Sequence, residues 1–290
     1  MERIQQKAGA MPTKNLSRGR LLRVAGFVAM AAGIPGLAAA ASMASPTTHA
    51  ALSKIVHNAS LSKSTSYSPA SELTRACPKN MAHVGHSCVD KYEGSLVEIK
   101  TDGTEVPFSA HEAPNGHHVR AVSRPNVAPQ GHISMVEAQK ACKASGKRLC
   151  HAGEWTKACK GPEQTKYPYG NERVANACVD TNRTSPMMKL YGGERSARTM
   201  NDPRANQMSN TVENTGAADA CTNGYGVHDM VGNVHEWTDD ASFRGGYYLD
   251  TAQNGEGCNY RTTAHAPAYY DYSTGFRCCA DENSLATDAD

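Results

Sequence analysis

Apolar positions recur with the helical period in only two stretches of this chain. The first stretch begins at Ser134, whose side chain can form a capping box with Glu137, and it ends before Gly146. Its predicted buried face consists of Met135, Ala138, Ala141 and Cys142. This pattern predicts one short amphipathic helix.

The second helical stretch runs from about Ala152 to Cys159 and ends at Gly161. Trp155, Ala158 and Cys159 share its predicted buried side. Elsewhere, apolar residues occur in short runs between Gly and Asn turns, such as FRGGYYL (243–249) and GFRCC (275–279), and these runs predict short strands. Short helices and short strands together predict an α+β domain with much irregular structure.

The beginning of the chain has the pattern of a targeting segment. Arg18, Arg20 and Arg23 precede a run of small apolar residues (24–41) that contains an Ala-rich cleavage site. We therefore predict a Sec-type signal peptide over residues 1–41 and a flexible Ser/Thr/Ala-rich linker over 42–72. A folded domain over 73–281 and an acidic tail over 282–290 follow. Export to a periplasm, a cell surface or the medium is expected, with membrane contact only through an uncleaved leader.

The charge of the chain does not indicate a nucleic-acid partner. The formal net charge is +2, but the predicted leader carries the basic excess. The remaining residues hold 24 basic and 27 acidic side chains, a net charge of −3. No basic field is left for nucleic acid.

All ten cysteines lie after the predicted leader and linker. An even number of cysteines in an exported chain implies up to five disulfides, and the sequence alone leaves their connectivity open. In the chain-entropy treatment, each closed loop contributes about 3–5 kcal/mol of stability. The sequence has no C-x-x-C pair, so a zinc ribbon or a thioredoxin motif is not predicted.

Several longer motifs occur in a recognisable order. These are GKRLCHAGEW (146–155), YPYGNE (167–172), NGYGVHDMVGNVHEWTDD (223–240), FRGG (243–246) and GFRCC (275–279). Together with RAVSRPNVAPQGHIS (120–134), they resemble the formylglycine-generating enzyme family, also called sulfatase-modifying factors, over roughly residues 77–281. The resemblance implies a variant of the C-type lectin-like fold, with little regular secondary structure and with bound calcium.

The resemblance also implies part of the disulfide pattern. The family's first pair corresponds to Cys142 with Cys278. Its second pair begins at the helix-end Cys159, for which the nearest candidate partner is Cys258. For the other cysteines we expect the pairs Cys77–Cys88, Cys150–Cys279 and Cys178–Cys221.

By the same resemblance, VGNVHEW (231–237) is a calcium loop. Calcium takes six to eight oxygen ligands, which flexible loops supply from side chains and carbonyls. The expected donors are the side chains of Asn233 and Glu236 and the main-chain oxygens of Val231, Gly232 and Val234. The alternative is a Gly-Asn turn with a hydrogen-bonded glutamate and no metal. A second, weaker calcium site would use Asn176 and Ala177.

Two histidines in the same region invite a transition-metal interpretation. His228 and His235 are seven residues apart across a Gly-Asn turn, and no cysteine or carboxylate spacing supports them as ligands. We expect them to be packed or solvated.

The family's enzyme oxidises a substrate cysteine to formylglycine with two cysteines that bind Cu(I). At the position of the first, this chain has Asp250, a hard oxygen ligand that does not replace a thiolate. The second corresponds to Cys258, close to Arg261, and a disulfide at Cys258 would remove its thiolate. Copper is therefore not expected, and Cys258 and Arg261 would carry chemistry only if the protein is an enzyme.

The sequence thus favours a secreted, calcium-stabilised and non-catalytic module that binds an unknown protein or glycan ligand. The expected binding face is rich in tyrosine, namely Tyr247, Tyr248, Tyr260, Tyr269, Tyr270 and Tyr272. The alternative for these tyrosines is that they cover a loop-rich core. Two alternative functions stay open, a metal-dependent oxidase of the formylglycine-generating type and a structural cell-envelope component.

Overall fold

The computed structural model describes residues 77–282. The predicted signal peptide and linker, and all but the first residue of the predicted acidic tail, lie outside the described residues. Within residues 77–282, no helix is long and apolar enough to cross a membrane.

Regular secondary structure is sparse, and the longest helix has ten residues. The strands are β1 (Met81–Val84), β2 (Ser87–Asp90), β3 (Gly94–Ile99), β4 (Glu105–Pro107), β5 (Val119–Ser123), β6 (Arg148–Leu149), β7 (His235–Trp237), β8 (Phe243–Arg244), β9 (Arg261–Thr262), β10 (Thr274–Phe276) and β11 (Cys278–Asp281). The helices are α1 (Met135–Ala144), α2 (Ala152–Lys160), α3 (Pro186–Tyr191) and α4 (Ala197–Met200), with short 3-10 turns η1 (Ala205–Gln207) and η2 (Gly257–Asn259).

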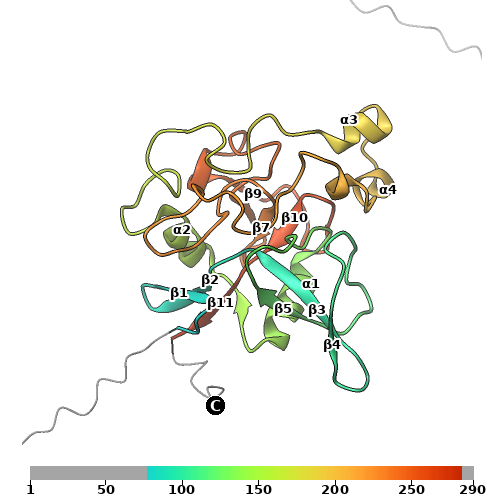
Figure 1. Ribbon diagram of the computed structural model, residues 1–290, viewed down its shortest axis with the longest axis horizontal. Helices are drawn as coiled ribbons and strands as arrows, with labels where there is room; N and C mark the ends of the chain where they lie inside the picture. The colour runs from blue at the N-terminus through green and yellow to red at the C-terminus, as the bar shows by residue number, and fades with distance from the viewer. Residues whose placement is uncertain (1–76, 283–290) are drawn as a thin grey trace, which may run out of the picture. The chain divides into compact units, whose positions relative to one another are not determined.

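The strands form three small sheets, in the orders β1-β2-β11-β6, β10-β7-β8-β9 and β4-β3-β5. Figure 1 shows the β3-β4-β5 sheet at the lower right, β1, β2 and β11 at the lower left, and β7, β9 and β10 above them. β10 pairs with β7 in parallel, and the other pairs are antiparallel. The expected α+β class with much irregular structure is confirmed.

Both predicted helices are present. Ser134 caps α1, because its hydroxyl accepts from the Glu137 amide at 3.2 Å. The reciprocal half of the predicted capping box is not formed, since the Glu137 carboxylate accepts instead from Lys140 at 2.9 Å. The second helix runs one residue further than predicted, to Lys160.

The two predicted strand runs are each interrupted. In 243–249 only the first two residues, Phe243 and Arg244, form a strand, because Gly245 and Gly246 take positive φ and turn the chain. In 275–279 the chain passes from β10 in one sheet to β11 in another. The residue between them, Arg277, is 0% exposed and therefore lies inside the domain.

Five disulfides crosslink the domain, four of them between segments at least 43 positions apart, and no free cysteine remains in the described residues. The pairs are Cys77–Cys88, Cys142–Cys278, Cys150–Cys279, Cys159–Cys258 and Cys178–Cys221, the same five that the sequence analysis expected. Eight of the ten cysteines lie in two hydrophobic clusters. A domain with this many disulfides is typical of a protein that folds in an oxidising compartment.

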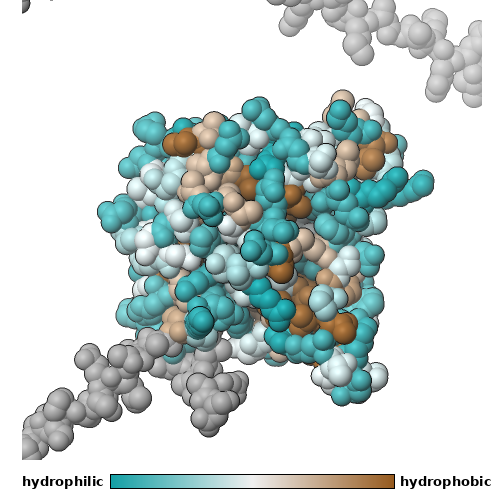
Figure 2. Space-filling model, in the orientation of Figure 1, coloured by the Kyte–Doolittle hydropathy of each residue, from teal (hydrophilic) through white to brown (hydrophobic). Residues whose placement is uncertain are grey.

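The face seen in Figure 2 is mainly polar, with hydrophobic side chains in small scattered groups, one of them over α3. Among residues 77–282, the large hydrophobic side chains that are exposed are Val106, Val136, Val174 and Met188. Single exposed apolar side chains of this kind are normal on a folded surface.

Candidate functional site

The chain turns sharply after β8, at two consecutive glycines. Gly245 and Gly246 both have φ of 74°, and a Cβ at Gly246 would lie 2.2 Å from the carbonyl oxygen of Asp250. Only glycine permits this close return of the chain. Two backbone hydrogen bonds between Tyr247 and Asp250, at 2.9 and 2.8 Å, close the turn.

The Asp250 carboxylate is held by three donors of the same loop. Oδ1 accepts from the backbone amides of Ala252 at 3.0 Å and Gln253 at 2.9 Å. Oδ2 accepts from the Tyr260 hydroxyl at 2.9 Å. These bonds fix an oxygen group at the position where the resemblance implies a copper-binding thiolate.

The second expected copper ligand is also committed. Cys258 lies in η2, is 0% exposed and is disulfide-bonded to Cys159 in α2. Arg261 is exposed, and its guanidinium lies 3.4 Å from the Asp240 carboxylate. In this structure, neither Asp250 nor Cys258 supplies a thiolate.

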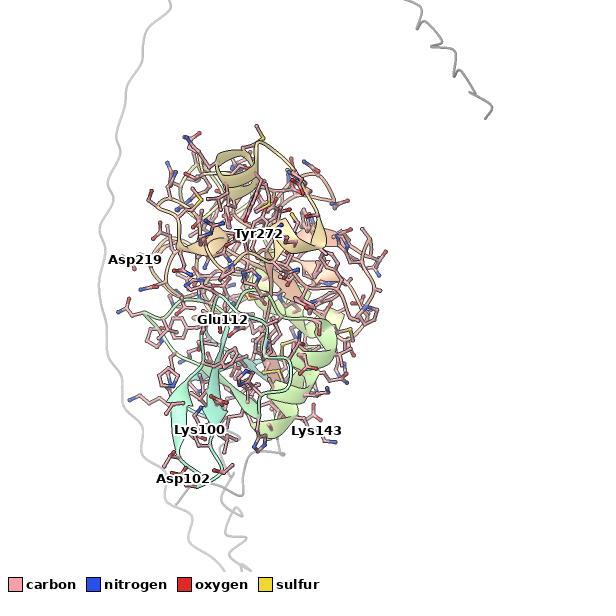
Figure 3. The ribbon with its side chains drawn as sticks, turned by 90° about the vertical axis from the view of Figure 1, so that its right-hand side faces the viewer. Lys100, Asp102, Glu112, Lys143, Asp219 and Tyr272 are labelled. Carbon is pink, nitrogen blue, oxygen red and sulfur yellow. A yellow bond between two sulfur atoms is a disulfide. The ribbon has the colours of Figure 1, made fainter. Side chains whose placement is uncertain are left out.

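A cavity of about 850 Å³ opens beside Asp250, with walls from segments 195–201, 235–254 and 260–273. Four of the expected face residues line it, namely Tyr247, Tyr260, Tyr269 and Tyr270. The expectation is wrong for Tyr248 and Tyr272, which are each 1% exposed and pack with Val179, Met187 and Ala205. Figure 3 labels Tyr272 in the half of the domain opposite the β3–β4 hairpin, whose turn carries Lys100 and Asp102. For these two tyrosines, the alternative that they cover the core is correct.

His235 lies at the inner side of this cavity and is stacked among aromatic rings. Its ring centroid is 4.9 Å from Phe243, 4.9 Å from Tyr247 and 5.5 Å from Tyr260. Burial lowers the pKa of His235 to about 3, so the imidazole is neutral at ordinary pH. His228 stacks on a different ring, Tyr92, at 5.0 Å, and the two histidines are packed as expected.

A separate cluster gathers three buried carboxylates near one guanidinium, that of Arg277. Glu93, Asp229 and Glu236 are 0%, 2% and 1% exposed. Glu236 accepts from Arg277 at 2.8 Å and from the Trp155 indole at 2.6 Å. The cluster of three acids and one base has a formal charge of −2, which is costly in a buried place.

Two carboxyl groups of this cluster, those of Glu93 and Asp229, have raised pKa values. Burial, followed by the charges of Asp229 and Glu236, raises the pKa of Glu93 well above its usual range. Burial also raises the pKa of Asp229 to about 6, with a further contribution from Glu236. With Arg277 as its one cation, the cluster therefore favours protonated Glu93 and Asp229.

Both side chains expected as donors of the predicted calcium loop are already bonded, and Glu236 accepts from Arg277 and Trp155. The Asn233 amide is committed, since its oxygen accepts from the Glu213 amide at 2.9 Å and its nitrogen donates to Glu93 at 2.7 Å. Asn233 therefore positions Glu93 and supplies no free side-chain oxygen. Glu93 and Asp229 were not expected from the sequence, although Asp229 lies within the quoted run 223–240 and Glu93 directly precedes β3.

The cluster matches a divalent cation in charge and in donor type only, because it offers carboxylate oxygens with a net charge of −2. The remaining expected donors are main-chain oxygens of Val231, Gly232 and Val234, which lie in the same buried loop. Within residues 77–282, no three His, Cys, Asp or Glu side chains converge in metal-ligand geometry.

The second expected calcium site offers less to a cation. Asn176 is exposed, and its backbone amide donates to Thr181. Ala177 is 5% exposed and bonds to the carbonyl of Val174. The buried acid of this loop, Asp180, already accepts from Arg173 at 3.0 Å.

Comparison with known proteins defines the class of this domain. The family described as "Sulfatase-modifying factor enzyme 1-like domain" matches residues 63–282, and the chain belongs to this family. The assignment confirms the family that the motifs indicated, and the structure shows the expected disulfide-rich α+β domain.

Curated relatives include both active and inactive members. An "Inactive C-alpha-formylglycine-generating enzyme 2" of Bos taurus is 29% identical over 167 residues, which are 52% of this chain and 50% of the relative. A "Formylglycine-generating enzyme" of Thermomonospora curvata is 31% identical over 139 residues, covering 47% of this chain and 40% of the relative. The chain spans half or less of the length of the curated relatives it matches.

Solved structures with some likeness have low TM-scores. The "Major Tropism Determinant I1 Variant" has a TM-score of 0.40 and 13% identity, and it covers 71% of this chain and 53% of that chain. The "Treponema denticola variable protein 1" has a TM-score of 0.36 and 14% identity, and it covers 71% of this chain and 100% of that chain. The family assignment therefore rests on the sequence match.

Proposed function

We propose that this protein is an exported, non-catalytic member of its family that binds a protein or glycan ligand in the tyrosine-lined cavity. The proposal rests on the residues found at the two positions where the family resemblance implies Cu(I)-binding thiolates. One is Asp250, whose oxygens are bonded by Tyr260, Ala252 and Gln253. The other is Cys258, whose sulfur is bonded to Cys159.

The disulfides and the leader-like N-terminal segment support export, and a relative named as inactive supports the non-catalytic role. The cavity of about 850 Å³ supports ligand binding, because pockets of some 300–1,000 Å³ are typical of small-ligand sites. The bonds of Asp250 and Cys258 keep the loop rigid beside the cavity, which favours recognition over chemistry.

A copper titration separates this proposal from the oxidase alternative. The purified protein, titrated anaerobically with Cu(I) in the presence of a competing chelator, is expected to bind no copper at the cavity. It is also expected to leave a cysteine-containing peptide unchanged under oxygen. Stoichiometric copper, together with conversion of the peptide cysteine to an aldehyde, would establish the oxidase and refute the binding module.

We also propose that calcium stabilises the domain at the cluster of Glu93, Asp229 and Glu236, with main-chain oxygens of the 231–234 loop as further donors. The excess of two negative charges supports the proposal. Bound calcium would offset the excess negative charge which, together with burial, raises the pKa values of Glu93 and Asp229.

The calcium proposal predicts a pH-dependent gain in stability. A carboxyl group whose pKa is raised on folding contributes to stability at low pH, where it is protonated. Without calcium, the contribution of Asp229 is lost as the pH rises from about 4, near its usual pKa, through about 6, its pKa in the folded protein. The increase in Tm on adding calcium, relative to EDTA, is therefore expected to be larger at pH 7.5 than at pH 5. Thermal unfolding followed by circular dichroism measures both values.

Two variants make the calcium test specific. Glu93→Gln removes one carboxylate and is expected to abolish most of the calcium gain at pH 7.5. Glu98→Gln, on the same strand region but partly exposed and paired with Lys100 and His117, is expected to retain it. Equal calcium gains at the two pH values, or a full gain in Glu93→Gln, would contradict this site.

A further inference from the structure

Seven of the 21 residues that line the cavity beside Asp250 carry aromatic rings, although two of the seven, Phe243 and Tyr260, are each only 2% exposed. Its ring-bearing residues are His235, Phe243, Tyr247, Tyr260, His265, Tyr269 and Tyr270. These rings pack against neighbouring rings. The ring centroids of His265 and Tyr269 are 3.8 Å apart and stacked, and those of Tyr247 and buried Tyr272 are 6.2 Å apart. A ligand that enters this cavity meets aromatic surface on several sides.

The two carboxylates in the cavity wall are turned toward tyrosine hydroxyls. Tyr260 donates to Asp250 at 2.9 Å, and Tyr269 donates to Asp271 at 2.5 Å. Asp271 accepts in addition from the Ser273 amide and hydroxyl. A phenol that donates to a carboxylate carries more electron density on its ring, so these rings present stronger negative faces.

The net charge of the cavity wall is negative. Asp250 and Asp271 oppose a single cation, Arg195, which is exposed and makes no hydrogen bond or ion pair within the described chain. His235 adds no charge, because burial holds it neutral. The formal charge of −1 favours a cationic ligand over an anionic one.

One buried nitrogen in this wall has no partner. His235 is 7% exposed, and its Nδ1 is buried without a hydrogen bond. An unpartnered polar atom in a buried place is unusual, and a neutral imidazole has a lone pair on one ring nitrogen. His235 therefore contributes a neutral ring to the wall.

Several hydrogen-bonding groups of the wall are already engaged within the described residues, although the Arg195 guanidinium is not. The Asp250 and Asp271 oxygens are occupied, Asn254 donates to Tyr260, and Asn201 donates to the carbonyls of Ala197 and Tyr270. A ligand that is oriented by hydrogen bonds would depend on the groups that remain, such as the Arg195 guanidinium. A quaternary ammonium group needs none, because ring faces and the local field hold it.

We infer that this cavity binds the quaternary ammonium group of a ligand, an inference that rests on the proposed binding function. The tyrosine and histidine rings surround the cation, and Asp250 and Asp271 act through the rings that they polarise. Arg195, which lies in the same wall, is a positive charge that repels the cation and does not bind it.

The test uses choline chloride as the probe and 3,3-dimethylbutan-1-ol as its neutral isostere. Binding to the oxidised protein at pH 8 and constant ionic strength is measured by NMR chemical-shift titration. Choline is expected to bind at least about tenfold more tightly than the isostere, the ratio that cation–π attraction at several rings supports. Equal binding of the two probes, or no binding of choline to the folded protein, overturns the inference.

Three variants test whether choline binds in this cavity and whether the cavity favours a positive charge. Tyr269→Leu removes a cavity ring and is expected to weaken choline binding about tenfold. Tyr169→Leu, which removes another half-buried and stacked tyrosine outside this cavity, is expected to leave it unchanged. Arg195→Gln is expected to strengthen choline binding by about two- to fivefold, since a like charge is removed.

Weaker choline binding in Arg195→Gln would show that the cavity recognises an anionic group, and it would overturn the inference. Unchanged near-ultraviolet circular dichroism and the absence of free thiols confirm the fold of each variant. Failure of the choline test leaves the copper result as it is, so it is distinguishable from failure of the proposed binding function.

Discussion

Replacing Arg277 by methionine is expected to lower the free energy of unfolding by about 3–5 kcal/mol. Arg277 is 0% exposed, and it is the cation that faces Glu236 at 2.8 Å. Its removal leaves three buried carboxylates without a positive partner, and it also frees the carbonyls of Asp90 and His228, which accept from the guanidinium at 2.8 and 2.7 Å. Urea unfolding at pH 7.5 in EDTA measures the loss.

The same measurement on Arg148→Met provides the matched control. Arg148 also binds two carboxylates, those of Glu154 and Asp281, but its side chain is 27% exposed. Water can solvate the remaining acids there, so the expected loss is at most about 1 kcal/mol. Adding Glu236→Gln to Arg277→Met should recover part of the stability, because one uncompensated charge is removed. Equal losses for the two arginine variants would refute the buried-charge argument.

Replacing both Cys159 and Cys258 by alanine is expected to cost about 4–5 kcal/mol. The disulfide closes a loop with a sequence separation of 99 residues, and in the chain-entropy treatment a loop of this length restricts the unfolded chain strongly. The expected decrease in Tm is about 10–20 °C for a domain of this size. Differential scanning calorimetry measures it.

The control pair for this experiment is Cys77 and Cys88, whose sequence separation is 11. Its replacement by alanines is expected to cost about 3 kcal/mol, since the loop is shorter. A smaller effect for Cys159 and Cys258 than for Cys77 and Cys88 would show that native-state contacts, rather than loop length, set the contribution of these crosslinks.

Local features of the fold follow from the sequence where a short-range rule decides them. Ser134 begins α1 because its hydroxyl accepts an orphan amide, and Gly146 and Gly161 have positive φ where the two helices end. The 243–249 run failed as a strand because Gly245 and Gly246 turn the chain. A pattern of apolar residues alone does not report such a turn.

The candidate site depends on contacts that no local pattern contains. Glu93 and Asn233 are 140 positions apart and meet at 2.7 Å, so only the completed fold shows that Glu93 joins the acidic cluster. Tyrosine is equally suited to a core and to a cavity wall, since it has an apolar body and a polar tip. The sequence could therefore not separate buried Tyr248 and Tyr272 from Tyr269 and Tyr270, which line the cavity.

The position of β11 has a consequence for how the molecule is made. This strand is inserted between β2 and β6, and its adjacent Cys278 and Cys279 are crosslinked to residues 136 and 129 positions earlier. The β1-β2-β11-β6 sheet therefore stays incomplete until residue 281 has been synthesised and has reached the oxidising compartment. Oxidation of Cys142 and Cys150 before that moment would leave them to pair with other cysteines.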